Sequence, residues 1–180
     1  EGGIQGLFRT SLKLEDVKYQ AAVCLVLTLK KPFTSFYWIN ISDRSMPFVA
    51  AIEHTNFIPK NRYGGHRILY LSNYLSSDSP LYHKNADELL AEYLPHLKKM
   101  EPDFEPGLVE ELRLFRDEAG QPIVGTNYSS RIPEHRTPID GLYLANTTQI
   151  YPEDRGMNYS VRLGQTVSKL VDEDLARYKT

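Results

Sequence analysis

The order of apolar and polar positions predicts several strands in the first half of the chain. Residues 19–29, YQAAVCLVLTL, are apolar at odd and even positions alike, which is typical of a central strand covered on both faces. β-Branched and aromatic residues predict further strands over residues 36–42, 48–56 and 67–75. The segments between them carry Pro, Gly and Asn, so an antiparallel meander of neighbouring strands is the simplest topology.

Helical periodicity begins after these strands. Asn85 and Glu88 have the spacing of a capping box, and apolar residues then recur at helical intervals. Pro95 interrupts this segment, so we expect a kink or two shorter helices. Residues 108–116 fit either a second helical start or a strand, and Ala119–Gly120 is expected to form a turn.

The last part of the chain predicts a strand, a polar loop and a long helix. The strand is expected over residues 142–146, and residues 157–178 place one apolar stripe along the helix. Gly164 and Ser168 share a neighbouring face that would let another backbone come close. A helix start that directly follows a buried strand is a natural site for an anion or an electron acceptor, although PEDRG at this junction also fits a capped surface loop.

Composition limits the class of protein. The 180 residues are 41% hydrophobic and 24% charged, with a net charge of -2, as in a globular domain without the basic excess of nucleic-acid binders. Without repeats or a linker, residues 1–180 are expected to form a single α+β domain. Its mixed, mainly antiparallel sheet would be covered by helices and end in the strand, loop and long helix.

Cysteine and hydropathy patterns add further limits. Cys24, the single cysteine, lies in an apolar run and is interpreted as a buried small hydrophobe. No segment has the length and apolarity of a membrane span or a signal peptide, so a cytoplasmic location is expected by default. The chain opens at Glu1 without an initiator methionine, which suggests a piece of something longer.

The segment GLYLANTTQIYPEDRGMNYSVRLG resembles the C-terminal flavin-binding signature of flavin-containing amine oxidases, protoporphyrinogen oxidase and phytoene desaturase. In that family a strand of the form G-L-Y-hydrophobic-A-G-D runs through a variable loop into a helix with a G-A-hydrophobic-x-S-G motif. Residues 141–145 match the strand, and Val161 and Gly164 have the spacing of the helix. The resemblance is specific over about residues 119–170 and architectural over residues 18–118, which would correspond to the substrate-side sheet and its helices.

Two departures from the family pattern concern the cofactor and the substrate. Asn146 and Thr147 replace the family's Gly and Asp, so neutral groups stand where a carboxylate usually handles the ribityl and pyrophosphate region. Gly156 occupies the position of the aromatic residue that helps to cage the amine in amine oxidases. A simple amine is therefore disfavoured as the substrate.

The resemblance also implies a set of FAD contacts at the start of the long helix. Backbone N–H groups near Arg155, Gly156, Met157 and Asn158 would face the pyrimidine edge of the flavin, where negative charge accumulates on reduction. The Arg155 side chain would add a positive charge there, or would pair at the surface with a neighbouring carboxylate. Asn146 and Thr147 complete the expected cofactor contacts.

One family element is missing from the sequence. The G-x-G-x-x-G turn that opens the nucleotide-binding domain does not occur in these 180 residues. The resemblance therefore implies a fragment of a larger flavoprotein whose partner is the N-terminal FAD-binding domain of the same protein. Alone, the chain is expected to bind FAD poorly or not at all.

Other side chains offer less chemistry. His54, Tyr70 and Tyr128 are the candidate substrate contacts, with Tyr128 favoured because it lies just before the signature strand. The histidines lack the spacing of metal ligands, so no metal site is expected, and no serine lies in G-x-S-x-G. No residue is assigned as a general base.

Three hypotheses for function remain open. The first is the substrate-side and C-terminal part of an FAD-dependent oxidoreductase, in which a small-molecule substrate loses hydride from a carbon to the flavin. The second resembles a flavin-dependent sugar-nucleotide mutase and needs arginines converging on a diphosphate, with Arg62, Arg67, Arg131 and Arg136 as candidates. The third is a non-catalytic binding or scaffold domain, which the Asn146-Thr147 replacement favours.

Overall fold

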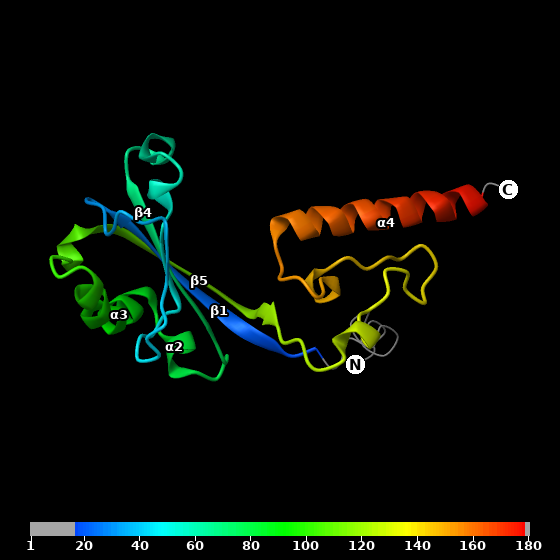
Figure 1. The fold of residues 1–180 in the computed structure, drawn as a ribbon, viewed down its shortest axis with the longest axis horizontal. Helices are drawn as coiled ribbons and strands as arrows, with labels where there is room; N and C mark the ends of the chain where they lie inside the picture. Colours follow the sequence, from blue (N-terminus) through cyan, green and yellow to red (C-terminus); the bar gives the residue numbers. More distant parts are fainter. Residues whose placement is uncertain (1–16, 179–180) are drawn as a thin grey trace. The chain divides into compact units, whose positions relative to one another are not determined.

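A computed structural model describes residues 17–178 (Figure 1). The contacts divide these residues into two compact units. The sheet unit comprises residues 19–121, and the terminal unit comprises residues 17–18 and 122–178.

The sheet unit is built on five strands in the order β2-β3-β4-β1-β5. The strands are β1 (Tyr19–Leu29), β2 (Trp38–Asn40), β3 (Ala50–Glu53), β4 (Arg67–Leu75) and β5 (Val109–Pro122). The predicted bounds of β1 and β4 are confirmed, whereas β2 and β3 are shorter than predicted. The meander holds only for β2, β3 and β4, because β1 pairs with β4 and β5 instead of β2. Its apolar sequence suits this inner position.

The principal helices are α2 (Pro80–His83), α3 (Ala86–Met100) and α4 (Met157–Tyr178). The 3-10 helices span His54–Asn56, Lys60–Tyr63, Pro106–Leu108, Tyr128–Ser130 and Thr147–Gln149. Helix α3 starts with the predicted capping box of Asn85 and Glu88. The expected division at Pro95 is wrong, because α3 runs through this residue as one helix. Tyr93 and Leu97 are fully buried on either side of Pro95, so packing holds both turns against the sheet.

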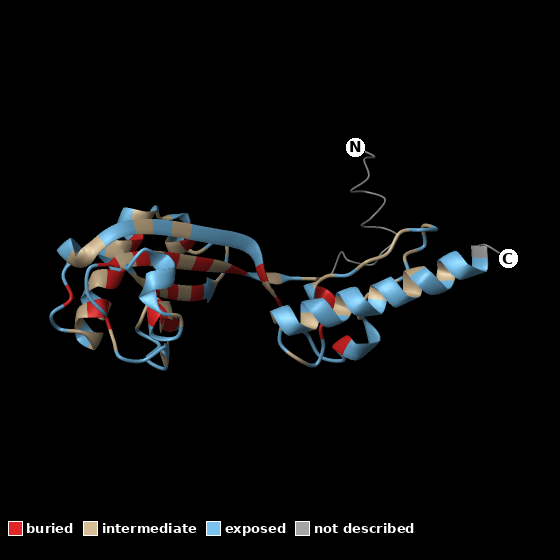
Figure 2. Ribbon diagram, turned by 90° about the horizontal axis from the view of Figure 1, so that it is seen from above, coloured by how far each residue is buried: buried red, intermediate tan, exposed pale blue. Residues whose placement is uncertain are grey.

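The core of the sheet unit lies on one face of the sheet. Along β1, residues at odd positions from Ala21 to Leu29 are buried, whereas those at even positions are only partly buried. Helix α3 covers the buried face with Leu89, Tyr93 and Leu97, and Figure 2 shows the buried residues gathered there. The expectation that β1 is covered on both faces is therefore wrong within this unit. The second face is apolar but open.

Residues 109–116 belong to strand β5, so the strand and not the helix is correct for this segment. The turn expected at Ala119–Gly120 is wrong. The strand continues through Ala119 and Gly120 to Pro122. A side chain at Gly120 would place its Cβ 2.5 Å from the Ala22 Cβ and 2.7 Å from the Ala22 backbone nitrogen. Glycine is required at this position because the backbones of β1 and β5 come too close for a side chain.

The terminal unit contains a predicted strand that is reduced to one bridge. Instead of a strand over residues 142–146, Tyr143 forms an isolated antiparallel bridge with Arg136. Two hydrogen bonds flank it, from the Thr137 N–H to the Leu142 carbonyl and from the Leu144 N–H to the His135 carbonyl. Pro133 and Pro138 bracket the partner segment and cannot donate to a longer ladder.

Helix α4 has the predicted bounds and is fastened to this bridge by Asp174. The Asp174 carboxylate accepts hydrogen bonds from Arg136 at 2.8 and 3.0 Å and from the Tyr143 hydroxyl at 2.8 Å. These bonds, with the bond to Arg136 as the largest cause, lower the pKa of Asp174 to about 2. Most of the apolar stripe of α4 is partly buried, as are Tyr159 and Asp174, whereas Leu175 and most other positions of the helix are exposed (Figure 2).

Candidate functional site

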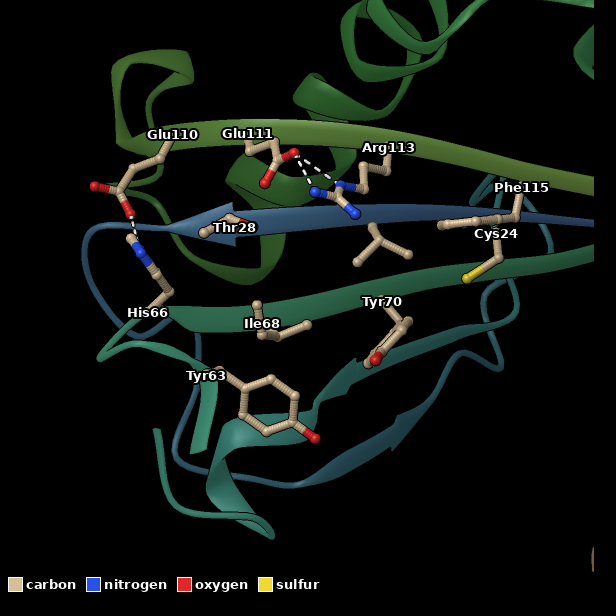
Figure 3. Close-up of a pocket in the computed structure, with 11 residues that line it drawn as sticks. Cys24, Thr28, Tyr63, His66, Ile68, Tyr70, Glu110, Glu111, Arg113 and Phe115 are labelled. Atoms are coloured by element: carbon tan, nitrogen blue, oxygen red, sulfur yellow. Dashed lines mark hydrogen bonds and ion pairs between the residues drawn. The ribbon is translucent and has the colours of Figure 1, made fainter. Parts of the chain in front are cut away.

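The candidate site is an apolar hollow on the open face of the sheet, with a volume of about 860 Å³ (Figure 3). Three consecutive strands of the sheet order, β4, β1 and β5, supply most of its lining. The lining residues are Cys24, Val26, Thr28, Tyr63, His66, Ile68, Tyr70, Glu110, Glu111, Arg113 and Phe115. The hollow lies entirely within the sheet unit.

The floor of the hollow is apolar because successive strands place matching residues on the same face. Val26 lies opposite Tyr70, and Thr28 lies opposite Ile68, in the antiparallel register of β1 and β4. Cys24 lies in the same row of β1, and burial raises the pKa of its thiol. The single cysteine is therefore a half-buried part of a cavity wall and not the fully buried hydrophobe that the sequence indicated.

His54 and Tyr70, two predicted substrate contacts, come together at one edge of this face. Their rings lie perpendicular with centroids 5.7 Å apart. His54 Nε2 and the Tyr63 hydroxyl form a hydrogen bond of 2.6 Å, and Tyr63 lines the hollow. His54 belongs to a 3-10 helix and not to the expected strand of residues 48–56, so strand alternation does not set its direction. Burial is the main cause that raises the pKa of Tyr70, with Tyr63 as a neighbour.

The opposite edge of the hollow carries charged side chains that pair with one another. Arg113 and Glu111 form an ion pair of 2.6 Å between Arg113 Nη2 and a Glu111 oxygen. His66 Nδ1 and a Glu110 oxygen lie 2.9 Å apart. Figure 3 shows both pairs at the rim along β5. The hollow thus has an apolar floor, a tyrosine-histidine edge and a rim whose charged side chains have polar partners within the rim.

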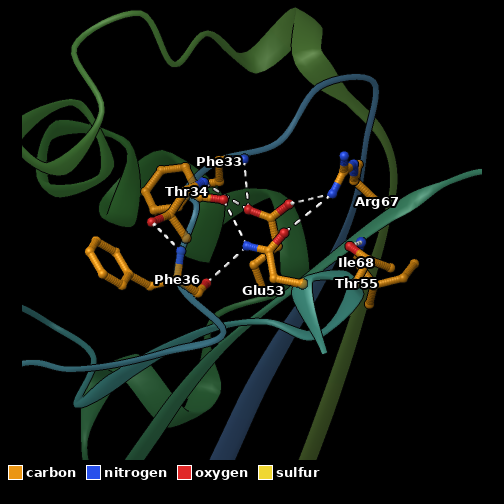
Figure 4. Close-up of polar contacts among 8 residues, drawn as sticks. Phe33, Thr34, Phe36, Glu53, Thr55, Arg67 and Ile68 are labelled. Atoms are coloured by element: carbon orange, nitrogen blue, oxygen red, sulfur yellow. Dashed lines mark hydrogen bonds and ion pairs between the residues drawn. The ribbon is translucent and has the colours of Figure 1, made fainter. Parts of the chain in front are cut away.

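A buried carboxylate shapes the loop beside β3 (Figure 4). Glu53 is 0% exposed, and one of its oxygens accepts hydrogen bonds from the Phe33 and Thr34 N–H groups at 2.8 and 2.7 Å. The other oxygen lies 3.7 Å from Arg67 Nη1. Burial outweighs these contacts and raises the pKa of Glu53. Asn56 supports the same loop by donating to the Thr34 and Phe36 carbonyls.

The predicted arginine candidates for a diphosphate do not form one cluster within either unit. Arg62 and Arg67 belong to the sheet unit, where Arg67 faces Glu53. Arg131 and Arg136 belong to the terminal unit. Arg136 pairs with Asp174, whose carboxylate raises the pKa of the guanidinium.

Tyr128 belongs to the terminal unit and is buried there. Its hydroxyl donates a 2.7 Å hydrogen bond to the Thr148 carbonyl, and its ring lies near the Tyr151 ring. This tyrosine therefore holds together two segments of the terminal unit. It does not line the hollow that includes Tyr70.

The six predicted cofactor contacts all lie in the terminal unit. Asn146 caps a 3-10 helix: its Oδ1 accepts from the Thr148 N–H, and its N–H donates to Gln149 Oε1 at 2.9 Å. Thr147 is exposed. At the start of α4, Met157 is 85% exposed, and Asn158 is also exposed.

Gly156 and Arg155 complete this segment. Gly156 leaves the backbone before α4 bare of a side chain, and a Cβ there would lie 2.6 Å from Asn158 Oδ1, which would have to move. Arg155 is partly buried, and its N–H donates to Asp154 Oδ1 at 2.8 Å. The first turn of α4 and the Thr147 hydroxyl are therefore accessible for a ligand in this unit, whereas the Asn146 groups already serve the cap.

Two other kinds of feature are absent from the described residues. Over residues 17–178, no cluster of three or more His, Cys, Asp or Glu side chains has the arrangement of a metal site. Within the same range, no helix combines the length and apolarity needed to cross a bilayer.

The sequence matches no protein-family model and no curated protein, but solved structures share its fold. A provisionally assigned protoporphyrinogen oxidase from Exiguobacterium sp. 255-15 aligns with a TM-score of 0.64 and 14% identity, over 89% of this chain and 36% of that one. An oxidoreductase from Methanosarcina mazei aligns with a TM-score of 0.56 and 20% identity, over 88% of this chain and 35% of that one. A reduced UDP-galactopyranose mutase aligns less well, with a TM-score of 0.46 and 18% identity, over 66% and 25% of the two chains.

The first two matches confirm the predicted α+β fold and its likeness to oxidoreductase structures. At these identities the likeness concerns the fold alone. The chain spans about a third of the length of the first two structures.

The sequence had not indicated the role of Cys24, His66, Arg113 or Phe115 in the hollow. The available signal was the apolar character of the even positions of β1, which are too apolar for a face that only meets water.

Proposed function

We propose that this chain is the substrate-side part of an FAD-dependent oxidoreductase and that the hollow on the open sheet face receives the substrate. The observation that carries the proposal is this hollow, in a fold that the chain shares with two oxidoreductase structures over nearly nine-tenths of its length. Apolar cavities with a few polar groups at the edge are the usual form of small-molecule sites.

In this proposal the bound flavin supplies the redox chemistry by accepting hydride from a substrate carbon. The chain positions the substrate and keeps water from it. Val26, Ile68 and Phe115 provide apolar contact, and Tyr63 provides a hydrogen-bonding group at the edge. The hollow is open on one side, as a substrate site completed by another part of a protein would be.

The terminal unit would contact the flavin. The fit rests on the bare backbone at Gly156 and the exposed first turn of α4, which suit a ligand that approaches the backbone closely. Thr147 would add a hydroxyl. The remaining contacts would come from an N-terminal FAD-binding domain of the same protein. Asn146 would contribute little, since its side chain caps Thr147–Gln149.

The cap formed by Asn146 also favours a second candidate, a binding or scaffold domain that keeps the fold without the cofactor. The mutase hypothesis receives less support, because Arg136 is already paired with Asp174.

The visible absorption spectrum separates the oxidoreductase from the scaffold domain. The longest natural form of the protein is purified and its flavin content is measured.

Flavin bands in about one-to-one ratio with protein are expected. A colourless protein that takes up no added FAD would overturn the oxidoreductase proposal and favour the scaffold.

Thr147→Val should weaken FAD binding about three- to ten-fold by removing one hydrogen bond. The matched control is Thr166→Val, because the Thr166 hydroxyl bonds to the Arg162 carbonyl of its own helix.

A further inference from the structure

The chemistry of the hollow indicates the class of molecule that it binds, an inference that rests on the proposed function. The first indication is the open face of β1. Ala22, Cys24, Val26 and Thr28 alternate with fully buried residues, yet three of the four are themselves apolar or weakly polar. Covering them with an apolar ligand would remove this surface from water, which is favourable.

The second indication is the pairing of charges at the rim. Arg113 contacts Glu111 at 2.6 Å, and His66 contacts Glu110 at 2.9 Å. An anionic ligand group would have to compete with Glu111 for Arg113, and it would also lie near a second carboxylate. A cationic group would have to share Glu111 with Arg113 or Glu110 with His66. Neither ionic class finds a charged side chain in the lining that lacks a polar partner.

The third indication is a single hydrogen-bonding edge. The Tyr63 hydroxyl reaches His54 Nε2 at 2.6 Å, and Tyr63 is 37% exposed on the wall of the hollow. A phenol oxygen bound on one side by an imidazole retains the capacity for a second hydrogen bond. A hydroxyl or carbonyl oxygen of a ligand is the natural partner.

We propose that the hollow binds a neutral, largely apolar molecule whose one hydroxyl or carbonyl oxygen hydrogen-bonds to Tyr63. The apolar part lies on the floor formed by Val26, Ile68 and Phe115, and the oxygen points to the edge held by His54. Tyr63 is a binding residue in this arrangement, and His54 is a positioning residue that orients the phenol.

Three probes of one shape and different charge test the proposal: naphthylmethanol, naphthoate and naphthylmethylammonium. Cys24 is the only cysteine of the chain and lies in the lining, so its rate of modification by a thiol reagent reports occupancy. The experiment uses the 180-residue chain, with circular dichroism to show that each variant is folded. Naphthylmethanol is expected to protect Cys24 at a concentration about ten-fold lower than either ion does.

Variants locate the bound oxygen. Tyr63→Phe should weaken naphthylmethanol binding about three- to ten-fold, as loss of one hydrogen bond does, while leaving methylnaphthalene binding unchanged. Tyr74→Phe is the matched control, because Tyr74 lies on the same face of β4 but outside the lining. His54→Gln should retain part of the Tyr63 orientation and lose less affinity than His54→Ala.

Tighter protection by naphthoate or by the ammonium probe would overturn the proposal, and so would the absence of protection by naphthylmethanol. An unchanged affinity in Tyr63→Phe would overturn the assigned orientation. The flavin content of the longest natural form is measured separately. A flavin-loaded protein that prefers a charged probe would refute this inference and leave the proposed oxidoreductase function standing.

Discussion

Two buried tyrosines show how differently one residue type is used. The Tyr93 hydroxyl is buried in the core without a hydrogen-bond partner among the described residues, and burial raises the pKa of Tyr93 to about 12. The Tyr128 hydroxyl is buried too, but it donates to the Thr148 carbonyl. A buried hydroxyl without a partner costs free energy, whereas one that is bonded stabilises the fold modestly.

Removing each hydroxyl should therefore change stability in opposite directions. Tyr93→Phe is expected to raise the free energy of unfolding by about 1 kcal/mol, and Tyr128→Phe is expected to lower it by about 1 kcal/mol. Urea unfolding followed by circular dichroism measures both. A loss of stability in Tyr93→Phe would show that its hydroxyl has a partner, such as a buried water.

Glu53 predicts a pH dependence of stability. Burial is the chief cause that raises the pKa of Glu53 in the folded state. The contribution of Glu53 to the free energy of unfolding is therefore largest below the unfolded pKa near 4.5. This contribution is lost as the pH rises through the folded pKa. Glu53→Gln cannot ionise and should not lose stability in this way. The free energy of unfolding of the variant, minus that of the native chain, should therefore increase from pH 4.5 upward.

The matched control is Glu105→Gln, an exposed residue paired with Lys98, which should follow the native pH profile closely. Glu53→Ala should be destabilising at every pH, because the Phe33 and Thr34 N–H groups lose their acceptor. Parallel profiles of stability against pH for Glu53→Gln and the native chain would contradict the assignment of this pH dependence to Glu53.

At the scale of elements, the attachment of α4 depends on Asp174. Its folded pKa of about 2 lies below its ordinary value of 3.8, so the Asp174 contacts stabilise the terminal unit above the ordinary pKa and are lost as pH falls toward 2. Asp174→Asn should lower the melting temperature at neutral pH and leave little difference near pH 2. Thermal melts at a series of pH values measure this effect.

Arg162→Gln is the control for the loss of a surface arginine, since the exposed Arg162 pairs with Glu153 at 3.2 Å and lies over the Tyr159 ring. Exposed pairs contribute little to stability. The control should therefore shift the melting temperature much less than Asp174→Asn or Arg136→Gln does. Equal shifts in the melting temperature would show that the contacts of Asp174 stabilise the protein no more than an exposed ion pair does.

Elements defined by their own residues were predictable, and elements defined by distant partners were not. The capping box of Asn85 and the continuous apolar run of β1 place α3 and β1 correctly. The strand over residues 142–146 failed because Pro133 and Pro138 limit its partner, and the turn at Gly120 failed because this glycine serves contact with β1. The pairing of His54 with Tyr63 also depends on two 3-10 helices that no periodic pattern marks.

At the scale of the whole molecule, the sheet unit has a core on one face only. Val23 and Val26 are the matched residues for a test, because they lie on opposite faces of β1. Val23→Ala should cost about 2 kcal/mol of unfolding free energy, and Val26→Ala should cost less than about 0.5 kcal/mol. Chemical denaturation of the 180-residue chain measures both.

A cost at Val26 as large as that at Val23 would show that the open face is covered in solution. The same comparison with a bound neutral ligand should make Val26→Ala more costly, because the ligand would then contact this side chain. The sheet therefore combines a structural face, whose burial the sequence predicted, with an open face, on which the register places Val26 beside Tyr70.

The missing side chain at Gly120 works as a register lock. If β5 slid by one position, Ala119 or Gln121 would collide with the backbone at Ala22, so the two strands admit one alignment at this end. The same slip would turn Arg113 and Phe115 away from the cavity and bring Leu112 and Leu114 into their places. A residue with no side chain, several positions from the cavity wall, thereby decides which side chains line the hollow.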